Sequence, residues 1–563
     1  MPEYLAPGVF VEETSFRAKS IEGVGTSTAA FVGMTARGPT ANKNTDPMPP
    51  MLTSFSDFER YYGGIDDLQI GGKPTRNFLA QSVAAFFSNG GGRLYVARVL
   101  GAGAKAATVD LNTAAANKKA VLDARNPGGA QIANSGGVNF RVVFRLVELA
   151  TTKKLARKQP PGTMIKTGNT VEFVGVSTIA DNDDATVIQS LSIEVWDPAG
   201  LVYEANGLGV HARHPRYIKT IMGDKPPLMR DALTNPVKLT LGDQMTEAEV
   251  MTALIPTGKE RVADLTTGVD GTGGPSTVDV GNALNRLLAL EDISIVAGPG
   301  LSSFAEAAAH NQLLIGHAET RRSYRIAVLD TPPDQEIQNV VDIKGKIDST
   351  KAALYYPWVR VANPLAATDP LAPSEIDLPP SGHVCGIYAR TDIARGVWKA
   401  PANETVTGAL DLQRAVSFGE QERLNPLGVN CIRALPNRGI RVWGARTISS
   451  DPEWKYVNVR RYFLYLESSI DRGTQWAVFE PNGERLWANV RQTISDFLYN
   501  EWVNGALLGS SAKEAFFVQC DRSTMTQNDL DNGRLVCLIG VAAIKPAEFV
   551  IFKIGQKTAD SRG

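Results

Sequence analysis

The segment that most constrains this chain is residues 548–554, which read EFVIFKI and are apolar on both sides of an extended strand. Side chains alternate between the two faces of a strand. Each face of this one therefore carries large apolar groups: Val550, Phe552 and Ile554 on the first, Phe549 and Ile551 on the second. Such a strand needs cover on two sides. It is either the central strand of the chain's own sheet or a strand lent to another molecule, and the alternation does not separate these alternatives.

The region before this strand, residues 425–547, carries the densest strand and helix signals. Residues 439–470 predict a strand, a polar turn at 449–452 and a longer amphipathic segment with paired arginines. Residues 484–507 predict an amphipathic helix, because apolar side chains recur there at helical spacing: Leu486, Val490, Ile494, Phe497 and Trp502. An apolar stripe of this width faces a core, so we expect a folded C-terminal domain.

The opening of the chain, residues 1–25, is interpreted as an arm. The sequence GVFVEET favours a short strand in which Val9 and Val11 share a face and Phe10 lies between them. The arm contains too little apolar material to fold alone. We therefore expect it to lie against another part of the molecule or against a partner.

Composition and charge restrict the class of protein. At 563 residues the chain exceeds what one hydrophobic core supports, which favours about three or four domains. The 58 basic and 59 acidic residues leave a net charge of −1, so no global field attracts nucleic acid. No apolar run approaches the ~20 residues of a membrane span, and the first residues lack a signal-peptide pattern. We expect no nucleic-acid partner, no membrane insertion and folding in a cytoplasm.

Alternating patterns divide the rest of the chain. Residues 26–100 and 268–424 alternate strand and helix signals, which favours an α/β core with a largely parallel sheet, closed by a helix in 379–403 that Pro401 helps to end. Residues 101–120 are rich in Ala, Gly and Lys, and residues 137–267 alternate like exposed antiparallel strands. We therefore interpret residues 101–267 as an inserted β-rich surface domain. The predicted fold class is a multidomain α/β and α+β protein with an extended arm at each end.

Three motifs are typical of enzymes, but each lacks the partners that the chemistry needs. Residues 268–275, GVDGTGGP, have no preceding strand and no following Lys-Ser/Thr, so a phosphate loop is not indicated. Residues 298–304, GPGLSSF, lack a GxSxG elbow and favour a tight strand-to-helix turn. Asp330, at a strand end, resembles a magnesium carboxylate without a phosphate loop. We predict no catalytic residue and no cofactor, since a fold alone does not license catalysis.

Metal binding is also disfavoured. His211 and His214 are spaced to face one ion, but no third ligand lies close in the sequence, and a surface loop is the preferred interpretation. The cysteines form no CxxC pair and are interpreted as buried, reduced thiols: Cys385, Cys431, Cys520 and Cys537.

Three stretches carry a resemblance to a known family. Residues 379–403 read PPSGHVCGIYARTDIARGVWKAPAN, residues 425–470 include RVWGART, and residues 4–33 begin YLAPGVFVEETSF. Together they resemble the contractile tail sheath family of phage tails and phage-derived contractile injection systems. The resemblance is strong near both ends of the chain, moderate from 270 to 364, and absent from the inserted region.

The resemblance implies a structural subunit and no enzymatic activity. It implies stacked six-fold rings in a helical assembly around an inner tube, which contract from a metastable extended state and drive the tube through a target envelope. The implied partners are copies of the same chain, the inner tube protein, and baseplate and tail terminator proteins. The implied location is a virion tail or phage-tail-like particle, assembled in a bacterial cytoplasm, with residues 425–547 facing the tube.

The resemblance also implies that each terminus adds a strand to a neighbouring subunit. The expected exchange residues are Val9, Phe10, Val11, Phe549, Val550, Ile551, Phe552 and Ile554. Arg485 and Arg491, on the predicted helix 484–507, are candidates for the tube contact. The arginines and tryptophans of this region would also suit single-stranded nucleic acid, but the interspersed glutamates favour contacts between proteins.

Alternatives remain within and outside this family. The sheath could belong to a phage virion, or to a bacterial extracellular contractile injection system or tailocin. An enzyme with an α/β nucleotide domain would need the catalytic cluster that the motifs lack. A soluble adhesin could share the β-rich insertion, but it would not account for two strand-like termini.

Overall fold

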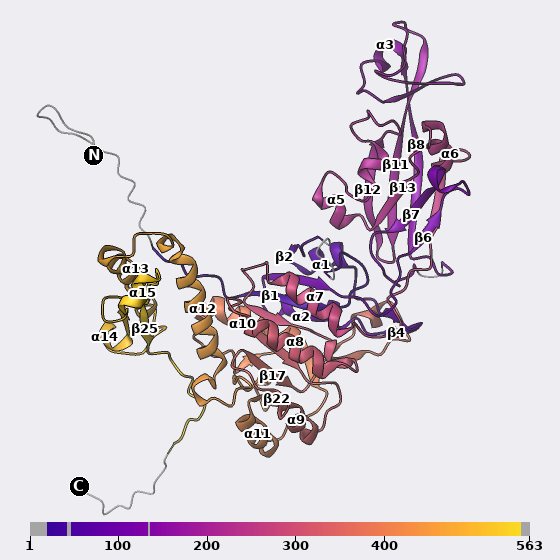
Figure 1. Ribbon diagram of the computed structural model, residues 1–563. Helices are drawn as coiled ribbons and strands as arrows, with labels where there is room; N and C mark the ends of the chain where they lie inside the picture. Colours follow the sequence, from indigo (N-terminus) through magenta and orange to yellow (C-terminus); the bar gives the residue numbers. More distant parts are fainter. Residues whose placement is uncertain (1–19, 42–46, 133–134, 553–563) are drawn as a thin grey trace, which may run out of the picture. The chain divides into compact units, whose positions relative to one another are not determined.

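The computed structural model (Figure 1) describes three stretches of the chain: 20–41, 47–132 and 135–552. The chain divides into two compact units. The larger unit is Thr26–Arg460, and the smaller one combines Arg461–Gly563 with Met1–Gly25. The described residues before Thr26 therefore belong with the C-terminal part of the chain.

A nine-stranded sheet organises the larger unit, in the order β2-β5-β1-β15-β16-β17-β22-β23-β20. The six strands from β5 to β22 are parallel, and β2, β23 and β20 pair in the antiparallel sense at the two edges. Their apolar side chains are buried on both faces, as in parallel sheets covered by helices. The strands are β1 (Thr28–Gly33), β2 (Met51–Leu52), β5 (Arg93–Arg98), β15 (Ile295–Ala297), β16 (Ile326–Asp330), β17 (Ala352–Tyr356), β20 (Glu404–Thr405), β22 (Val429–Leu435) and β23 (Gly439–Val442).

Helices cover both faces of this sheet. Three of them, α7 (Thr277–Leu287), α8 (Ala307–Glu319) and α9 (Ile337–Lys344), share a buried cluster with the alternate strand residues such as Ala30 and Leu329. The opposite face meets α2 (Phe78–Ser88) and α10 (Ser381–Arg395). There the rings of Phe31 and Phe86 meet edge to face at 5.6 Å, and the hydroxyls of Tyr355 and Tyr388 lie 2.7 Å apart. The predicted α/β layer with a largely parallel sheet is confirmed.

The inserted domain leaves the core between β5 and β15. Its larger sheet has the antiparallel order β10-β9-β11-β8-β14, with β12 beside β11, and its smaller sheet has the order β13-β7-β6. Phe140, Val142 and Phe144 of β8 point into the domain's core, while Arg141 on the other face forms a bidentate pair with Asp264. The predicted alternation is therefore confirmed. The strands are β6 (Thr108–Asp110), β7 (Ala120–Ala124), β8 (Phe140–Thr152), β9 (Met164–Thr167), β10 (Thr170–Phe173), β11 (Ala185–Asp197), β12 (Gly200–Leu208), β13 (Val237–Leu241) and β14 (Glu260–Leu265).

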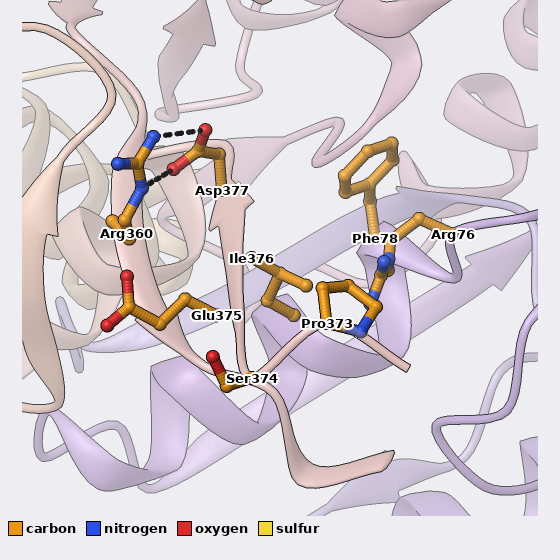
Figure 2. Close-up of a pocket in the computed structure, with 8 residues that line it drawn as sticks. All are labelled: Arg76, Phe78, Arg360, Pro373, Ser374, Glu375, Ile376 and Asp377. Atoms are coloured by element: carbon orange, nitrogen blue, oxygen red, sulfur yellow. Dashed lines mark hydrogen bonds and ion pairs between the residues drawn. The ribbon is translucent and has the colours of Figure 1, made fainter. Parts of the chain in front are cut away.

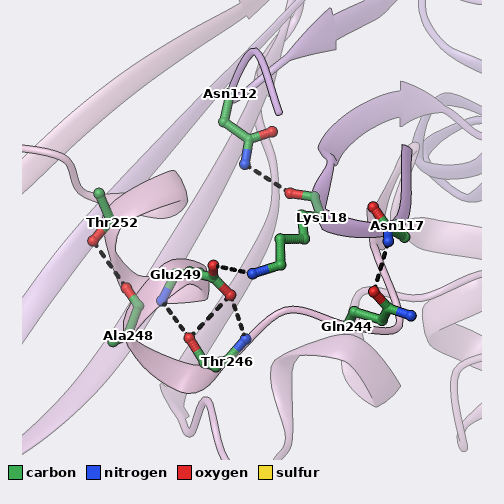
Figure 3. Close-up of polar contacts among 8 residues, drawn as sticks. All are labelled: Asn112, Asn117, Lys118, Gln244, Thr246, Ala248, Glu249 and Thr252. Carbon is green, nitrogen blue, oxygen red and sulfur yellow. Dashed lines mark hydrogen bonds and ion pairs between the residues drawn. The ribbon is translucent and has the colours of Figure 1, made fainter. Parts of the chain in front are cut away.

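A surface clasp joins the two ends of this domain (Figure 3). Thr246 and Glu249 form a capping box at the start of α6 (Glu247–Leu254). Glu249 also pairs with Lys118 at 2.7 Å, and Asn117 donates to Gln244 at 2.6 Å. The hydrogen bond from Lys118, with those from Thr246, lowers the pKa of Glu249 to about 2. The clasp therefore holds α6 on the segment that precedes β7 over a wide pH range.

Buried charges join the inserted domain to the core. Arg37, after β1, pairs with Asp197 at the β11–β12 turn, with 2.8 Å between Nε and Oδ2. Arg98, at the end of β5, is 1% exposed and donates to the carbonyls of Thr35, Gly38 and Pro127. Since unpaired buried charges are costly, these contacts hold the insertion in a definite place on the core.

Asp330 has a structural role at the carboxyl end of β16. Its Oδ1 accepts from the backbone N–H of Ser381 at 2.8 Å, and its Oδ2 accepts from the Ser381 hydroxyl at 2.5 Å. These are the first groups of α10, so the carboxylate caps that helix. Burial raises the pKa of Asp330 to about 7. The side chain that resembled a magnesium ligand is thus used inside the fold.

The smaller unit is built around two helices. α13 (Glu484–Val503) buries Leu486, Val490, Ile494 and Phe497, as its apolar spacing predicted, and Trp502 is half-buried. The other elements are α12 (Val457–Gly473), which starts in the larger unit, α14 (Ala512–Ala515), β24 (Phe516–Gln519), α15 (Gln527–Asp531) and β25 (Leu538–Val541).

Two expected boundaries differ from the structure. The C-terminal domain does not start at residue 425, because β22 and β23 continue the core sheet beside β17 and the smaller unit starts only at Arg461. The helix after Pro379 ends at Arg395, well before Pro401, because Gly396 adopts a φ of 89° there. A Cβ at Gly396 would lie 2.4 Å from the ring of Trp398, so the close approach also requires glycine.

The raised pKa of Asp330 predicts a specific pH dependence of stability. Because its folded pKa of about 7 exceeds the unfolded value of 3.8, its contribution is complete below pH 4 and is lost as the pH rises towards 7. Asp330→Asn, which cannot ionise, should remove this loss of roughly 1 kcal/mol per pH unit. Urea unfolding of both proteins from pH 4 to 8 measures it. The unfolding free energy of the variant should increase relative to that of the wild type as the pH rises. Parallel profiles of the two proteins would contradict the raised pKa of Asp330.

Candidate interaction surfaces

The C-terminal apolar segment is uncovered in the described chain. The side chains of Phe549, Val550, Ile551 and Phe552 are 69%, 69%, 79% and 82% exposed, and residues 548–552 form no strand. The alternative in which this segment is the central strand of its own sheet is therefore wrong. Exposed aromatic and β-branched side chains in this number are a surface that needs a partner. The other expected exchange residues lie outside the described residues: Val9, Phe10, Val11 and Ile554.

The described end of the N-terminal arm is fixed to the smaller unit. Ile21 is buried, and it fills the space where a Cβ of Gly473 would lie. The N–H of Val24 donates to the hydroxyl of Ser469 on α12 at 3.1 Å. A Cβ at Gly23 would lie 2.2 Å from the hydroxyl of Tyr465, so any side chain there would displace that hydroxyl. Residues 21–24 therefore form an anchor on α12 for whatever precedes them.

A buried carboxyl lies beneath this anchor. Glu501 of α13 is 6% exposed and accepts from the hydroxyls of Tyr465 at 2.9 Å and Tyr462 at 3.2 Å. Burial raises the pKa of Glu501. Two phenol donors satisfy the carboxyl, so the group links α12 to α13.

The two arginines expected at a tube contact lie on α13. Arg485 and Arg491 are both exposed. Arg491 also donates from Nη1 to the carbonyl of Cys520 at 3.3 Å. The two positions are six residues apart, which places them about 120° apart around the helix axis. A single flat partner therefore cannot face both equally.

Phe479 is an exposed residue that the sequence pattern did not single out. It lies between α12 and α13, is fully exposed and has a φ of 67°. A left-handed conformation is unfavourable for a bulky side chain, and exposure of a whole phenyl ring is unfavourable in water. Both costs at one residue mark a candidate contact, but no periodicity of the sequence reveals it.

The larger unit has a hollow beside β19 (Glu375–Leu378), with a volume of about 640 Å³ (Figure 2). Arg360 and Asp377 form a bidentate pair on one wall, at 2.9 and 3.1 Å, which neutralises both charges. Of the residues that line it, Ser374 carries the one hydroxyl, and no histidine, lysine or cysteine accompanies it. The lining offers polar contacts without a nucleophile and its base.

The strand order reverses between β1 and β15, where doubly wound sheets bind ligands. Here the chain's own side chains occupy the place. A Cβ at Gly33 would lie 3.4 Å from the side chain of Leu79, and one at Gly300 would lie 2.6 Å from the Cβ of Phe78. Residues 298–304 form a tight turn with a short 3-10 helix, as their sequence predicted.

The remaining candidate ligands are placed by local contacts. His214 accepts at Nδ1 from the N–H of Arg216, and burial lowers its pKa. The Nε2 of His211 lies 3.8 Å from Glu247. Within the described stretches no group of three His, Cys, Asp or Glu side chains is arranged for a metal, and no helix is long and apolar enough to cross a membrane. The cysteines are free thiols, and Cys537 is half-buried instead of buried.

Comparison with known proteins gives a contiguous match. A model of the phage tail sheath protein central domain matches residues 273–448, and one of the phage tail sheath C-terminal domain matches residues 449–557. A protein described as a prophage major tail sheath protein of Pseudomonas aeruginosa is 27% identical over 243 residues, which cover 42% of this chain and 59% of the relative. The chain thus spans little more than half of that relative's length.

Solved structures share the fold over the whole chain. The sheath of the anti-feeding prophage in its contracted state superposes with a TM-score of 0.55 and 20% identity, over 99% of this chain and 100% of the other. The contracted sheath of an extracellular contractile injection system, PVC, gives 0.53 and 22%, over 99% of both chains. At this identity the likeness describes the fold.

The conformation of Phe479 predicts a stabilising substitution. Phe479→Asn should raise the free energy of unfolding by about 1 kcal/mol, because asparagine tolerates the left-handed region and exposes no ring. Thermal unfolding followed by circular dichroism measures the change. Phe418→Asn is the control, since Phe418 is 68% exposed in α11 (Phe418–Leu424) without a positive φ. A less stable Phe479→Asn protein would show that the ring packs within the chain.

Proposed function

Because this chain belongs to the phage tail sheath family, we propose that it is the subunit of a contractile sheath. In this proposal it assembles as stacked six-fold rings around an inner tube and contracts from a metastable extended state, which drives the tube through a target envelope. The observation that carries the proposal is the match of both family domains, end to end, over residues 273–557. The subunit is a structural protein, with no enzymatic activity, cofactor or metal.

Exchange of strands is the proposed link between subunits. Residues 549–552 carry four exposed apolar side chains that follow β25, so they can pair with a sheet edge of a second copy. Strand addition supplies main-chain hydrogen bonds as well as side-chain burial. The anchor at residues 21–24 gives the N-terminal arm a fixed point of departure from α12. Links of this kind persist while rigid units rotate, because the connecting segments absorb the change.

Contraction is proposed to draw on burial between subunits, without nucleotide hydrolysis. At about 25 cal/mol per Å², an additional 200 Å² of apolar surface buried per subunit contributes about 5 kcal/mol. Summed over a sheath of many subunits, this gain drives the change of lattice. The free energy needed to break the contact with the tube must be smaller than this gain. Small, polar contacts meet this condition, for example arginines that retain part of their hydration.

The proposed partners are further copies of this chain, the inner tube protein, and baseplate and tail terminator proteins. The particle is either a phage virion or an extracellular contractile injection system or tailocin, assembled in a bacterial cytoplasm. The likeness to the anti-feeding prophage and PVC sheaths is compatible with the second candidate, and the prophage relative is compatible with the first. Electron microscopy of the purified protein should show striated tubes, and particles from the producing cell should lack a DNA-filled head if the second candidate holds.

Removal of either terminal segment should abolish assembly without unfolding the subunit. Deletion of residues 1–16 leaves the anchor at 21–24. Of the described residues, deletion after Ala547 removes the half-buried Glu548 and the four exposed side chains of 549–552. Both variants should keep the circular dichroism and melting midpoint of the full chain but remain monomeric by light scattering. Two double variants test the two faces of the strand separately: Val550→Ser with Phe552→Ser, and Phe549→Ser with Ile551→Ser. Normal tubes from either truncation would contradict strand exchange.

Charge reversal on α13 tests the proposed tube contact. Arg485→Glu and Arg491→Glu, made singly, should weaken extended sheath on its tube to different extents, because a repulsion replaces an attraction only where the arginine faces the tube. The readout is the salt concentration at which the sheath contracts or dissociates, which should fall for a residue that faces the tube. Lys513→Glu, exposed in α14, is the control. Unchanged salt sensitivity of both arginine variants would remove them from the contact.

A further inference from the structure

Two cysteines of the smaller unit face each other across a strand pair. β24 and β25 are antiparallel, with the register Phe516↔Val541 to Gln519↔Leu538. One step beyond this pairing, Cys520 follows β24 directly and Cys537 directly precedes β25. The register therefore places Cys520 opposite Cys537. Residues directly opposite in an antiparallel pair have Cα atoms about 4.5–5.5 Å apart, which is within the range of about 4.4–6.8 Å that a disulfide spans.

The side chains confirm that the thiols are neighbours. The two thiols lie close enough for each to influence the pKa of the other. Cys520 is fully buried, and Cys537 is half-buried, so a small reagent has access through Cys537. The other two cysteines lie in the larger unit, on α10 and β22, and both are buried. Cys520 and Cys537 are thus the pair that needs no rearrangement to react.

We propose that Cys520 and Cys537 are a redox modification site, at which the dithiol closes to an intrachain disulfide. The co-reactant is a low-molecular-weight disulfide. A Cys537 thiolate attacks one of its sulfurs, and the mixed disulfide releases one small thiol. Cys520 then attacks Sγ of Cys537 and releases the second. One S–S bond forms and one breaks, so two electrons and two protons pass from the cysteines to the small disulfide.

The disulfide would close a loop around residues 521–536, which carry α15. It would also tie β25 to β24 at the end of the strand pair that is remote from the exposed apolar segment 549–552. In a reducing cytoplasm the pair stays open. If the proposed sheath function holds, the pair closes after the particle leaves the cell, and the strand pair next to the exchange segment is stiffened at that stage.

The pKa values set the rate of closure. Burial raises the pKa of Cys537 to about 12 and raises the pKa of Cys520 as well. The thiolate fraction is therefore small at pH 7 and grows about tenfold with each pH unit below the pKa. Closure by a small disulfide should be slow at neutral pH and markedly faster at pH 8.5.

The test uses the reduced full-length chain with oxidised glutathione at pH 8.5. Thiols titrated after denaturation should fall from the four of the sequence to two, and peptide mapping should join Cys520 to Cys537. The variant Cys385→Ser with Cys431→Ser is the matched control. It retains only the thiols of Cys520 and Cys537, and both should be lost on oxidation. Cys537→Ser should form no intrachain disulfide. The midpoint of urea unfolding should rise on oxidation of the wild type and not of Cys537→Ser.

Three results would overturn the site: four thiols retained after oxidation, a disulfide mapped to Cys385 or Cys431, or a product that joins two chains on a non-reducing gel. Because the thiols are titrated after denaturation, the readout does not depend on tube formation. A chain that closes the disulfide but forms no tubes would refute the sheath function alone. A chain that forms tubes with four free thiols would refute the redox site alone.

Discussion

The pairing of β1 with two neighbours holds the larger unit together. β5, which precedes the inserted domain in sequence, lies on one side of β1, and β15, which follows that domain, lies on the other. Six backbone partners join β1 to β5, and three join it to β15, and every residue of β1 is buried. Both ends of a long excursion of the chain are thereby fixed to one central strand.

This arrangement lets the core carry a large insertion without losing its own packing. The insertion has a separate apolar cluster, and it meets the core through polar contacts such as Arg37 with Asp197 and the carbonyl ligands of Arg98. Such contacts need exact partners, because a buried charge without one is strongly destabilising. The insertion can therefore vary in sequence over its surface while its attachment is geometrically strict.

The smaller unit uses the opposite arrangement. Its two helices are joined by a satisfied buried carboxyl, Glu501, but apolar groups remain at its surface, namely Phe479 and the segment 549–552. The same unit holds the cysteine pair beside the strand that leads to this segment. The proposed strand exchange requires a subunit that remains folded alone and yet has uncovered apolar residues at its ends. A buried core with an exposed terminal segment is compatible with both requirements.

The amino-acid pattern was sufficient where a periodicity met a buried face: the parallel core strands, the alternating strand β8 and the apolar stripe of α13. It was misleading where a boundary depended on pairing at a distance, as at residue 425, since β22 joins β17 through hydrogen bonds that no local pattern encodes. Pro401 seemed to end α10, whereas Gly396 does so because the Trp398 ring closes over it.

The sequence by itself determined the family, the α/β and antiparallel character of the sheets, and the surplus of apolar residues at 548–554. These features depend on composition, on residue spacing and on long stretches such as RVWGART that resemble the family. Only the tertiary structure decided that this surplus stays uncovered in the described chain, that Asp330 caps a helix, that Phe479 protrudes and that Cys520 faces Cys537. Each of these depends on which distant segments meet in space, and a one-residue change of register or of helix end would alter all of them without changing any local pattern.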